Sequence, residues 1–427
     1  MKRMHSGPGT LQRLWVLIVG VSLGSAAARA DVVLDWNEIA VNTAVANKQS
    51  PYAQARSAAI VQLAVFEAVN AITGEYKPYL GTITAPPSAS TEAAAIEAAY
   101  QVLRAYFPNS ATALLAAYTN SLAQIPNDQA KLDGIAAGDA AAQAMIALRA
   151  SDGSVPPLFK VPGPAVPGEW QATISCPIVH GIAQGTGFHW QNVTPFGIPS
   201  ASAFLLGPPS ELTSNEYAKA YNEVMTVGSV NSTERPQDRA NVARFYAASS
   251  PTQVFNQAAE QVALEQGGSL SQNARALALI NMVMSDSLVA SFLNKYHYNF
   301  WRPETAIHAG ATDSNPKTQP DPSYAPFITT PCFPSYPSNH GSAGNAAAEV
   351  LRRIYGEAGH SITLTNPAVP SIVLQYTSFK QITDDISDAR VYGGIHFRTD
   401  QEAGAHLGRA VGKAVYKNNL RPVHDDD

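Results

Sequence analysis

Apolar residues recur at helical spacing along most of this chain. Val61, Ala64, Val65, Ala68 and Ile72 form one continuous stripe, the pattern of a helix that packs on a protein core. The same periodicity predicts several helices in the first third of the chain, over residues 35–46, 53–72, 91–105, 111–122 and 128–150.

The helical periodicity is lost between residues 153 and 209, where proline and glycine are dense. This texture predicts a long ordered loop, and long loops of this kind are often functional. We therefore expect residues 31–152 to form an N-terminal helical lobe. Residues 210–420 are expected to form a C-terminal helical catalytic domain after this Pro/Gly-rich excursion.

The strongest helix signal in the second half covers residues 270–295, where Ser269 and Gln272 fit a capping box. No alternating pattern indicates a sheet. The expected fold class is therefore all-α, with two helical lobes and a site inside the second one. The tail, residues 421–427, is expected to be disordered. Further helices are predicted over residues 341–355, 373–388 and 400–416.

The amino terminus has the arrangement of a secretory signal peptide. Lys2, Arg3 and Arg13 precede an apolar run at residues 14–23, and small residues follow up to Ala30. An apolar run of about ten residues is too short to cross a bilayer. No later stretch is expected to be long and apolar enough either. Residues 1–30 therefore predict export to the periplasm or the extracellular space, without a membrane span.

Composition narrows the function classes. The formal net charge of the 427 residues is −5, which gives no sign of the basic face that nucleic acid requires. The two cysteines, Cys176 and Cys332, could form a disulfide in an exported protein or remain buried thiols. Both readings stay open, because sequence does not show whether two Cα atoms come within bonding distance.

The first motif, residues 295–303, contains two cations, Lys295 and Arg302. They lie seven positions apart, so on a helix both would project from one face. The aromatic residues between them indicate burial, and buried cations need an anionic partner. The alternative is a solvated basic pair at a helix end, where cations are favoured in any case.

The second motif, residues 337–341, precedes a predicted helix. Backbone amides at a helix start are free to bind anions. Ser338 could donate a hydrogen bond to such an anion, and His340 could act as a general acid or base. The alternative is an N-cap serine beside a core histidine.

The third motif, residues 390–400, places Arg390 and His396 on either side of a Gly393-Gly394 turn that can bring backbone close to a ligand. Asp400 follows His396 by four positions, so its carboxylate could reach the imidazole and fix its tautomer. The alternative is a structural ion pair plus a loop histidine.

Together the three motifs supply three cations, a hydroxyl, backbone amides and two imidazoles. That set suits a tetrahedral anion such as phosphate or vanadate. It suits a metal cation poorly, since a cation would need several carboxylates, thiolates or imidazoles.

The motifs have the form Lys-x6-Arg-Pro, Pro-Ser-x-His and Arg-x5-His-x3-Asp, in this order. By this triple, and by stretches over most of residues 31–420, the chain resembles the vanadium-dependent haloperoxidases, within the type 2 phosphatidic acid phosphatase superfamily. The resemblance implies a helical bundle with an additional N-terminal helical lobe. It also implies vanadate as cofactor, in a site that phosphate can occupy.

The resemblance implies a role for each motif residue. His396 would bond the vanadium, or attack phosphorus in a phosphatase, and Asp400 would orient it. His340 would be the acid-base group, and Lys295 would also polarise the reacting oxygen. This chain departs from the family at Asn339, where glycine is usual, and at Ala389, where serine is frequent. The oxyanion would be held by Lys295, Arg302, Ser338, the amide of Asn339, and Arg390.

The leading hypothesis is a vanadate-dependent haloperoxidase that uses hydrogen peroxide to oxidise a halide to a hypohalous acid equivalent. The alternative is a secreted acid phosphatase that acts on a phosphate ester through a phosphohistidine at His396. A third hypothesis is a binding protein on this fold that has lost its activity. A homodimer is the default expectation for the assembly.

Overall fold

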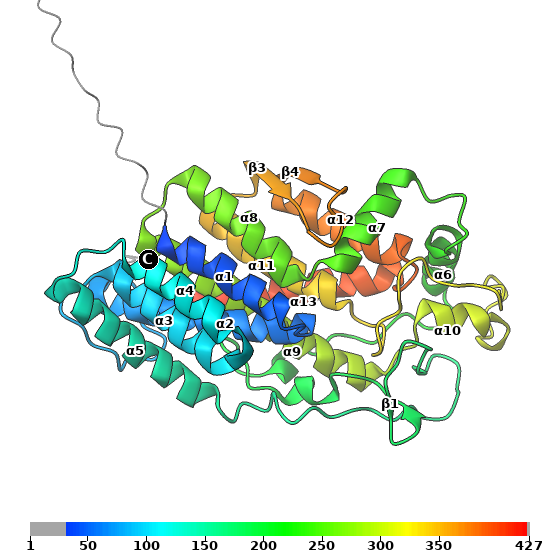
Figure 1. Cartoon of the computed structure of the whole chain (residues 1–427). Helices are drawn as coiled ribbons and strands as arrows, with labels where there is room; N and C mark the ends of the chain where they lie inside the picture. The colour runs from blue at the N-terminus through cyan, green and yellow to red at the C-terminus, as the bar shows by residue number, and fades with distance from the viewer. Residues whose placement is uncertain (1–30, 425–427) are drawn as a thin grey trace, which may run out of the picture. The chain divides into compact units, whose positions relative to one another are not determined.

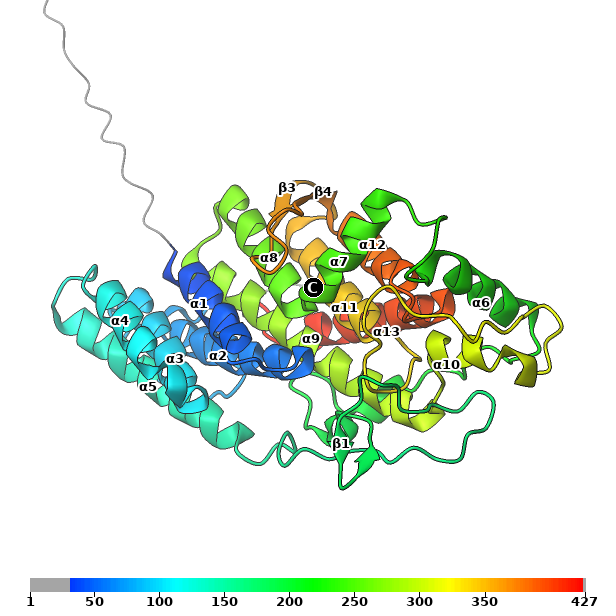
Figure 2. The ribbon, with the colours of Figure 1, turned by 45° about the vertical axis from the view of Figure 1, so that its right-hand side comes forward.

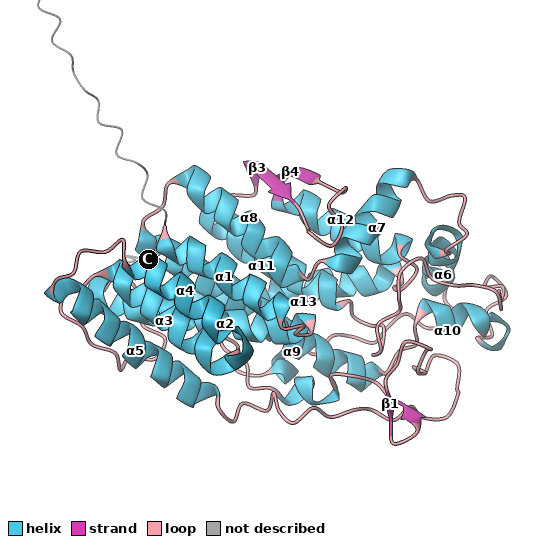
Figure 3. Cartoon of the chain, in the orientation of Figure 1, coloured by secondary structure: helices cyan, strands magenta, loops and turns pink. Residues whose placement is uncertain are grey.

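Helices make up nearly all of the regular structure of this chain (Figure 3). The structure is a computed structural model that describes residues 31–424, and the predicted signal peptide lies outside the described residues. From Asp31 onwards the chain forms one compact unit. The all-α class is confirmed, with two short antiparallel hairpins as the additions.

The helices predicted in the first third are all present, with ends within a few residues of those predicted. Ser50 caps α2 with its hydroxyl and Pro51 stands in the first turn, while Gly74 ends the helix in the left-handed conformation. The helices are α1 (Val32–Ala46), α2 (Pro51–Thr73), α3 (Thr91–Tyr106), α4 (Ala111–Leu122) and α5 (Gln129–Arg149).

The Pro/Gly-rich excursion is ordered, and a buried carboxylate anchors it. Asp286 on helix α9 (Leu270–Tyr298) accepts hydrogen bonds from the amides of Phe196, Gly197 and Ile198, at 2.6, 2.7 and 3.0 Å. The excursion contains one hairpin and two short 3-10 helices: β1 (Ile178–Val179), β2 (Ile182–Ala183), η2 (Phe188–Asn192) and η3 (Ala201–Phe204).

A disulfide joins this excursion to the loop before the second motif. Cys176 and Cys332 are bonded, with their Cα atoms 5.1 Å apart. The sequence left open whether these cysteines form a disulfide or remain buried thiols, and the structure shows the disulfide.

The second half is built around α9, which is buried along nearly its whole length. The helices and strands of this half are α6 (Asn215–Gly228), α7 (Gln237–Ala248), α8 (Pro251–Gln266), α9 (Leu270–Tyr298), α10 (Pro303–His308), η4 (Gly310–Thr312), α11 (Asn339–Tyr355), β3 (Ala358–Leu364), β4 (Leu374–Ser378), α12 (Phe379–Tyr392) and α13 (Arg398–Asn418).

One expectation about secondary structure was wrong. Residues 373–388 are not one helix, because Leu374–Ser378 forms strand β4 and pairs with β3, with Ile362 opposite Tyr376. The pairing buries Tyr376, whose hydroxyl contacts Tyr246 and Asp385. A strand of five residues is too short for its pattern to be told from a helix by periodicity.

The two predicted lobes do not have separate hydrophobic cores. Helix α9 runs through the middle of the described fold, between α2 on one side and α11 with α13 on the other (Figures 1 and 2). One hydrophobic core includes residues of α2, α3, α9, α11 and α13. The N-terminal helices therefore pack directly on the helix that begins the first motif.

Helices α2 and α9 are long and apolar enough to span a membrane by length and composition, contrary to expectation. Of their most apolar windows, 89% and 94% respectively lie buried inside the protein. That burial is what a core helix of a folded domain shows.

The end of the chain also differs from expectation. Residues 421–424 are not disordered: the amide of Lys77 donates to the carbonyl of Arg421 at 2.7 Å, and the amide of Val423 donates to the carbonyl of Glu75 at 2.9 Å. These hydrogen bonds join segments that are far apart in the chain, so no local sequence pattern predicts them. Residues 425–427 lie outside the described residues.

Candidate active site

The second and third motifs line one cavity of about 300 Å³, and the first motif lies beside it. Asn339 and His340 reach it from the start of α11, Arg390 from the end of α12, and His396 from the turn that follows. Lys295 and Arg302 are fully buried beside it. The structure therefore brings both histidines and all three cations of the motifs together.

The first motif does not form a single helical face, contrary to expectation. Helix α9 ends at Tyr298, Asn299 adopts the left-handed conformation with φ 49°, and Arg302 has extended backbone before α10. Lys295 and Arg302 approach each other because the chain turns at Asn299, not because they lie two helical turns apart.

Lys295 is held by backbone carbonyls. Its Nζ donates to the carbonyls of Pro334, Ser335 and Pro337, at 2.8, 2.9 and 2.6 Å. An ammonium group has three donors, and all three are used. Lys295 thus adds its charge from behind the cavity and fixes the loop that leads to the second motif.

The two arginines have unused donors. Arg302 donates from Nε to the carbonyl of Phe333 and from Nη1 to that of Ile395, at 2.8 and 2.9 Å. Its Nη2, and both Nε and Nη2 of Arg390, are buried without a hydrogen-bond partner among the described residues. Buried donors are nearly always paired, so orphaned guanidinium groups indicate a missing anion.

Burial and neighbouring charges shift the pKa values of the cations at this site. Burial lowers the pKa of Arg302 to about 9 and that of Arg390 to about 10. Burial, and then the neighbouring Arg302, lower the pKa of Lys295 as well. Each group is less easily charged chiefly because burial removes it from water, and neighbouring cations add to this effect for Lys295 and Arg302. A bound anion would supply the compensating charge.

His396 is oriented by Asp400, as predicted. Its Nδ1 lies 2.9 Å from Oδ2 of Asp400, and its Nε2 lies 2.9 Å from Nη1 of Arg302. An Nδ1–H bonded to the carboxylate leaves Nε2 as an acceptor directed at the cations. Burial raises the pKa of Asp400 to about 6.

Sequence reasoning missed Ser335. Its hydroxyl donates to Oδ2 of Asp400 at 2.6 Å and lies 3.3 Å from Nδ1 of His396, and all three residues are buried. Ser335 lies three positions before Ser338, but no spacing rule marks it, because Asp400 is 65 residues further along the chain.

Ser338 caps α11, which was the alternative reading of that residue. Its Oγ accepts a hydrogen bond from the amide of Gly341 at 3.1 Å. A hydroxyl that accepts in this way still has its own proton to donate. The carboxamide oxygen of Asn339 accepts from Ser291 of α9 at 2.7 Å, which ties that side chain to α9.

His340 lies between the cations and a backbone carbonyl. Both of its ring nitrogens are 3.5 Å from Nη1 of Arg390, and Nε2 is 3.4 Å from the carbonyl of Ser249. Burial and nearby guanidinium groups hold the pKa of His340 and of His396 well below the usual value. Both rings are therefore neutral at pH 7 without an anion.

The Gly393-Gly394 turn packs against the end of α6. Gly394 has φ +81°, and a Cβ added there would lie 2.3 Å from the carbonyl oxygen of Gly228. This packing requires the glycine, and the expected approach of the turn to a ligand stays a prediction.

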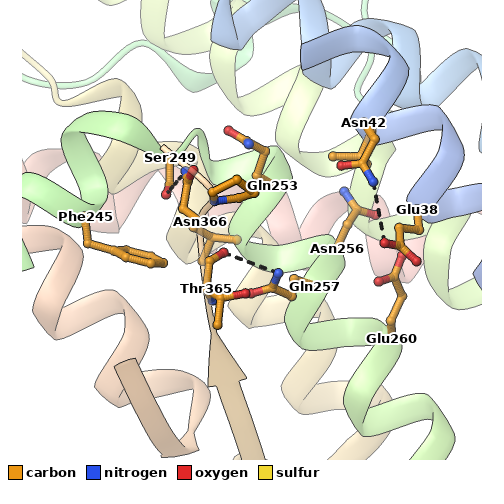
Figure 4. Close-up of a pocket in the computed structure, with 13 residues that line it drawn as sticks. Glu38, Asn42, Phe245, Ser249, Gln253, Asn256, Gln257, Glu260, Thr365 and Asn366 are labelled. Atoms are coloured by element: carbon orange, nitrogen blue, oxygen red, sulfur yellow. Dashed lines mark hydrogen bonds between the residues drawn. The ribbon is translucent and has the colours of Figure 1, made fainter. Parts of the chain in front are cut away.

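Another cavity, of about 100 Å³, is lined in part by Ser249, whose carbonyl lies near His340 (Figure 4). Glu38 and Glu260 lie at one end of it, and Asn366 donates to the hydroxyl of Ser249 at 2.8 Å. Its described lining has no lysine, arginine or histidine. Burial raises the pKa of Glu260 to about 7. An oxyanion would not be stabilised there.

Within residues 31–424, no three or more histidine, cysteine, aspartate or glutamate side chains are grouped so that they could hold a metal ion. The orphaned guanidinium groups fit a tetrahedral anion instead.

Comparisons with known proteins find relatives for the second half of the chain. Residues 275–425 match the family described as VCPO second helical-bundle domain. The vanadium chloroperoxidase of Curvularia inaequalis is 28% identical over 185 residues, which cover 36% of this chain and 30% of that protein. The matched region thus spans under a third of that relative.

Solved structures resemble nearly the whole chain. A bacterial vanadium-dependent iodoperoxidase has a TM-score of 0.77 at 24% identity, covering 93% of this chain and 98% of its own. A bacterial vanadium-dependent chloroperoxidase in its apo form has a TM-score of 0.71 at 16% identity, covering 86% and 94%. At these identities the likeness shows the fold.

Proposed function

We propose that this chain, which has the fold of the vanadium-dependent haloperoxidases and carries the VCPO second helical-bundle domain over residues 275–425, is itself a vanadate-dependent haloperoxidase. It would use hydrogen peroxide to oxidise a halide to a hypohalous acid equivalent. The observation that carries the proposal is the set of orphaned guanidinium donors beside two neutral histidines in one cavity.

The donors suit vanadate. The free N–H groups of Arg302 and Arg390 would hold its oxygens, with the hydroxyl of Ser338 and the amide of Asn339 at the start of α11. His396 would bond the vanadium through Nε2. When bound, vanadate supplies the activation of hydrogen peroxide for oxygen transfer to the halide, and the protein supplies position and charge.

The two histidines would have different roles, His396 in bonding the vanadium and His340 in proton transfer. Asp400 holds the Nδ1 proton of His396, so that Nε2 keeps its lone pair. His340 is partly exposed and neutral, so it can accept a proton from hydrogen peroxide as the peroxide binds. Lys295 would strengthen the positive potential around the reacting oxygens without leaving its three carbonyls.

The cavity lining favours oxidation chemistry. Among the described residues that line it there is no methionine, cysteine or tryptophan. Thioethers and thiols are readily oxidised, and both cysteines of this chain are paired in the disulfide. The sulfur side chains that an oxidant attacks most readily are therefore absent from the described lining of the cavity.

The alternative is a phosphatase that uses the same residues. His396 would attack phosphorus through Nε2, since Asp400 already orients the ring for a nucleophile. His340 would protonate the leaving oxygen. The cations would stabilise the charge of the transferring group.

The deciding experiment uses purified protein with vanadate, hydrogen peroxide and bromide. Bromination of monochlorodimedone that depends on vanadate supports the haloperoxidase. Hydrolysis of a phosphate ester that vanadate inhibits supports the phosphatase instead. Substituting His396 by alanine should abolish either activity, and retained activity would show that His396 has another role.

We also infer export and self-association, from the apolar run at residues 14–23 and from the frequency of symmetric dimers. Amino-terminal sequencing of the secreted protein should begin near Asp31. Light scattering of that protein should give the mass of a dimer. An uncleaved cytoplasmic chain, or a monomer, would contradict the respective inference.

A further inference from the structure

We infer that the cavity beside the oxyanion site binds a single-ring aromatic molecule, such as a phenol, and that this molecule receives the halogen before the oxidised halide escapes. The inference rests on the proposed function. It concerns the part of the cavity that the oxyanion chemistry leaves unused.

The lining of the cavity is divided by chemistry. Its carboxamide, imidazole and guanidinium groups come from the second and third motifs, whereas most of the other lining residues are apolar and come from other segments. Leu288 on α9 is 2% exposed and forms part of these apolar walls. The other main apolar contributors are Pro51 and Tyr52 of α2, Pro251 of α8, and Pro331 and Phe333 of the loop before α11.

The size of the cavity sets the size of its occupant. An apolar cavity of about 150 Å³ is sufficient to bind benzene. The present cavity is about 300 Å³, so one ring can lie beside a tetrahedral anion. A fused two-ring molecule would compete with the anion for space. Cavities of this kind are typical of small-molecule sites, with apolar walls and a few polar groups.

Aromatic side chains give the wall a fixed shape. Tyr52 packs against Trp190 and Phe292, with ring centroids 4.6 and 5.1 Å apart. Phe292 in turn packs edge-on against Phe333, at 5.3 Å. Aromatic pairs in tilted and edge-on geometry add to the energy of burial. An incoming ring would contact Tyr52 and Phe333, the two members of this set that line the cavity.

The transfer step balances without a further reagent. With hypobromous acid, a ring carbon takes bromine with its bonding electrons drawn from the ring, and the oxygen–bromine bond breaks to release hydroxide. The ring then loses its proton, which the hydroxide takes up as water. The products are bromophenol and water. A ring held beside His340 and Arg390 would meet the oxidant where it forms.

Binding can be tested without turnover, on wild-type protein loaded with phosphate. Calorimetric titration with phenol should show one saturable site. Leu288→Phe should fill the cavity and weaken phenol binding at least tenfold, while phosphate affinity changes less than twofold. Leu288→Met, which keeps the volume, is the matched control and should retain both. Absence of saturable phenol binding in the wild type would overturn the inference.

A second variant tests the same wall in case the Leu288→Phe protein does not fold. Leu288→Ala should enlarge the cavity and allow 2-naphthol to bind in the presence of phosphate, which the wild type should not do. Equal exclusion of 2-naphthol from both proteins would contradict the assigned wall.

Turnover separates this inference from the proposed function. With vanadate, peroxide and bromide, phenol and monochlorodimedone compete as acceptors. The enzyme should brominate phenol at least fivefold more, relative to monochlorodimedone, than reagent hypobromous acid does. An equal ratio would mean that free hypobromous acid is the halogenating agent, which overturns the inference but leaves the peroxidase standing. Saturable phenol binding without any vanadate-dependent oxidation would instead reject the proposed function.

Discussion

The hydroxyl of Ser335 ties the loop before the second motif to the third motif. It donates to the carboxylate of Asp400, and hydrogen bonds to charged groups contribute roughly 1.5–3 kcal/mol. This bond opposes the rise that burial causes in the pKa of Asp400. Ser335 is thus a positioning residue for His396 and not a group that touches substrate.

Removing that hydroxyl should change the pH profile of the enzyme. In Ser335→Ala the pKa of Asp400 should rise above about 6, because the charged form loses a donor. The acidic limb of kcat against pH should therefore move to higher pH. Ser335→Thr keeps a hydroxyl and should restore the wild-type limb. A lower kcat with an unmoved limb in Ser335→Ala would point to a merely structural role.

Arg390 should determine the affinity for the oxyanion. Its buried Nε and Nη2 have no partner within the described part of the chain, so an anion would satisfy both. Arg390→Gln should raise the Kd for phosphate about 10–100-fold, which corresponds to roughly 1.5–3 kcal/mol. Calorimetric titration measures this. Arg409→Gln, at an exposed position of α13, is the control and should bind phosphate as the wild type does.

At the scale of elements, the glycines of α13 allow this helix to pack closely on α11. Helix α13 lies against α11 through Gly404, Gly408 and Gly412. A Cβ added at Gly408 would lie 2.2 Å from the carbonyl oxygen of Ser342. This packing places the start of α11, with Ser338 and His340, against the start of α13, with Asp400.

Separating these two helices should weaken the site. Gly408→Ala should push α13 away from α11 and destabilise the protein by about 1–3 kcal/mol, the usual effect of overpacking. Urea denaturation measures this loss. Gly163→Ala is the matched control, because a Cβ there meets nothing within 4 Å. Equal stability of the two variants would show that α13 can move without cost.

At the scale of the whole molecule, the cluster of cations couples folding to pH. The folded-state pKa of His340 and of His396 lies below 6.5. Below about pH 6.5 the unfolded chain therefore binds more protons than the folded one, and stability falls as the pH falls. Asp400 acts oppositely between 3.8 and about 6, where the folded protein binds the extra proton.

A bound anion should reverse the effect of the histidines. It compensates the guanidinium charges that lower their pKa values, so binding should take up protons and strengthen as the pH falls. Sulfate is a suitable probe, since it does not titrate in this range. It should raise the Tm more at about pH 5.5 than at about pH 7.5. In His340→Ala/His396→Ala this difference should shrink, and an undiminished difference would assign the protons elsewhere.

The disulfide should stabilise the whole described fold. Cys176 and Cys332 enclose a long loop, with a sequence separation of 156, and closing a loop of about 100 residues contributes about 4–5 kcal/mol in the chain-entropy treatment. A reductant should lower the free energy of unfolding by roughly 2–5 kcal/mol, measured by urea denaturation. Cys176→Ser/Cys332→Ser should be insensitive to reductant. A wild type that is equally insensitive would contradict this.

The sequence by itself determined many of the helices and the candidate residues of the site. Helical periodicity and caps are local, so α1 to α5 and α9 could be predicted within a few residues. The three motifs predict an oxyanion site, because residue type and spacing carry that chemistry. The contact between His396 and Asp400 was also predicted, since four positions separate them.

Only the tertiary structure decided what depends on distant partners. Strand β4 exists because β3 pairs with it, and Ser335 matters because Asp400 reaches it from 65 residues away. The disulfide, the ordered end at Val423 and the hydrophobic core that residues of both halves share have the same origin. Contacts across the fold depend on how the chain packs, and a pattern read along the chain records only neighbours in sequence.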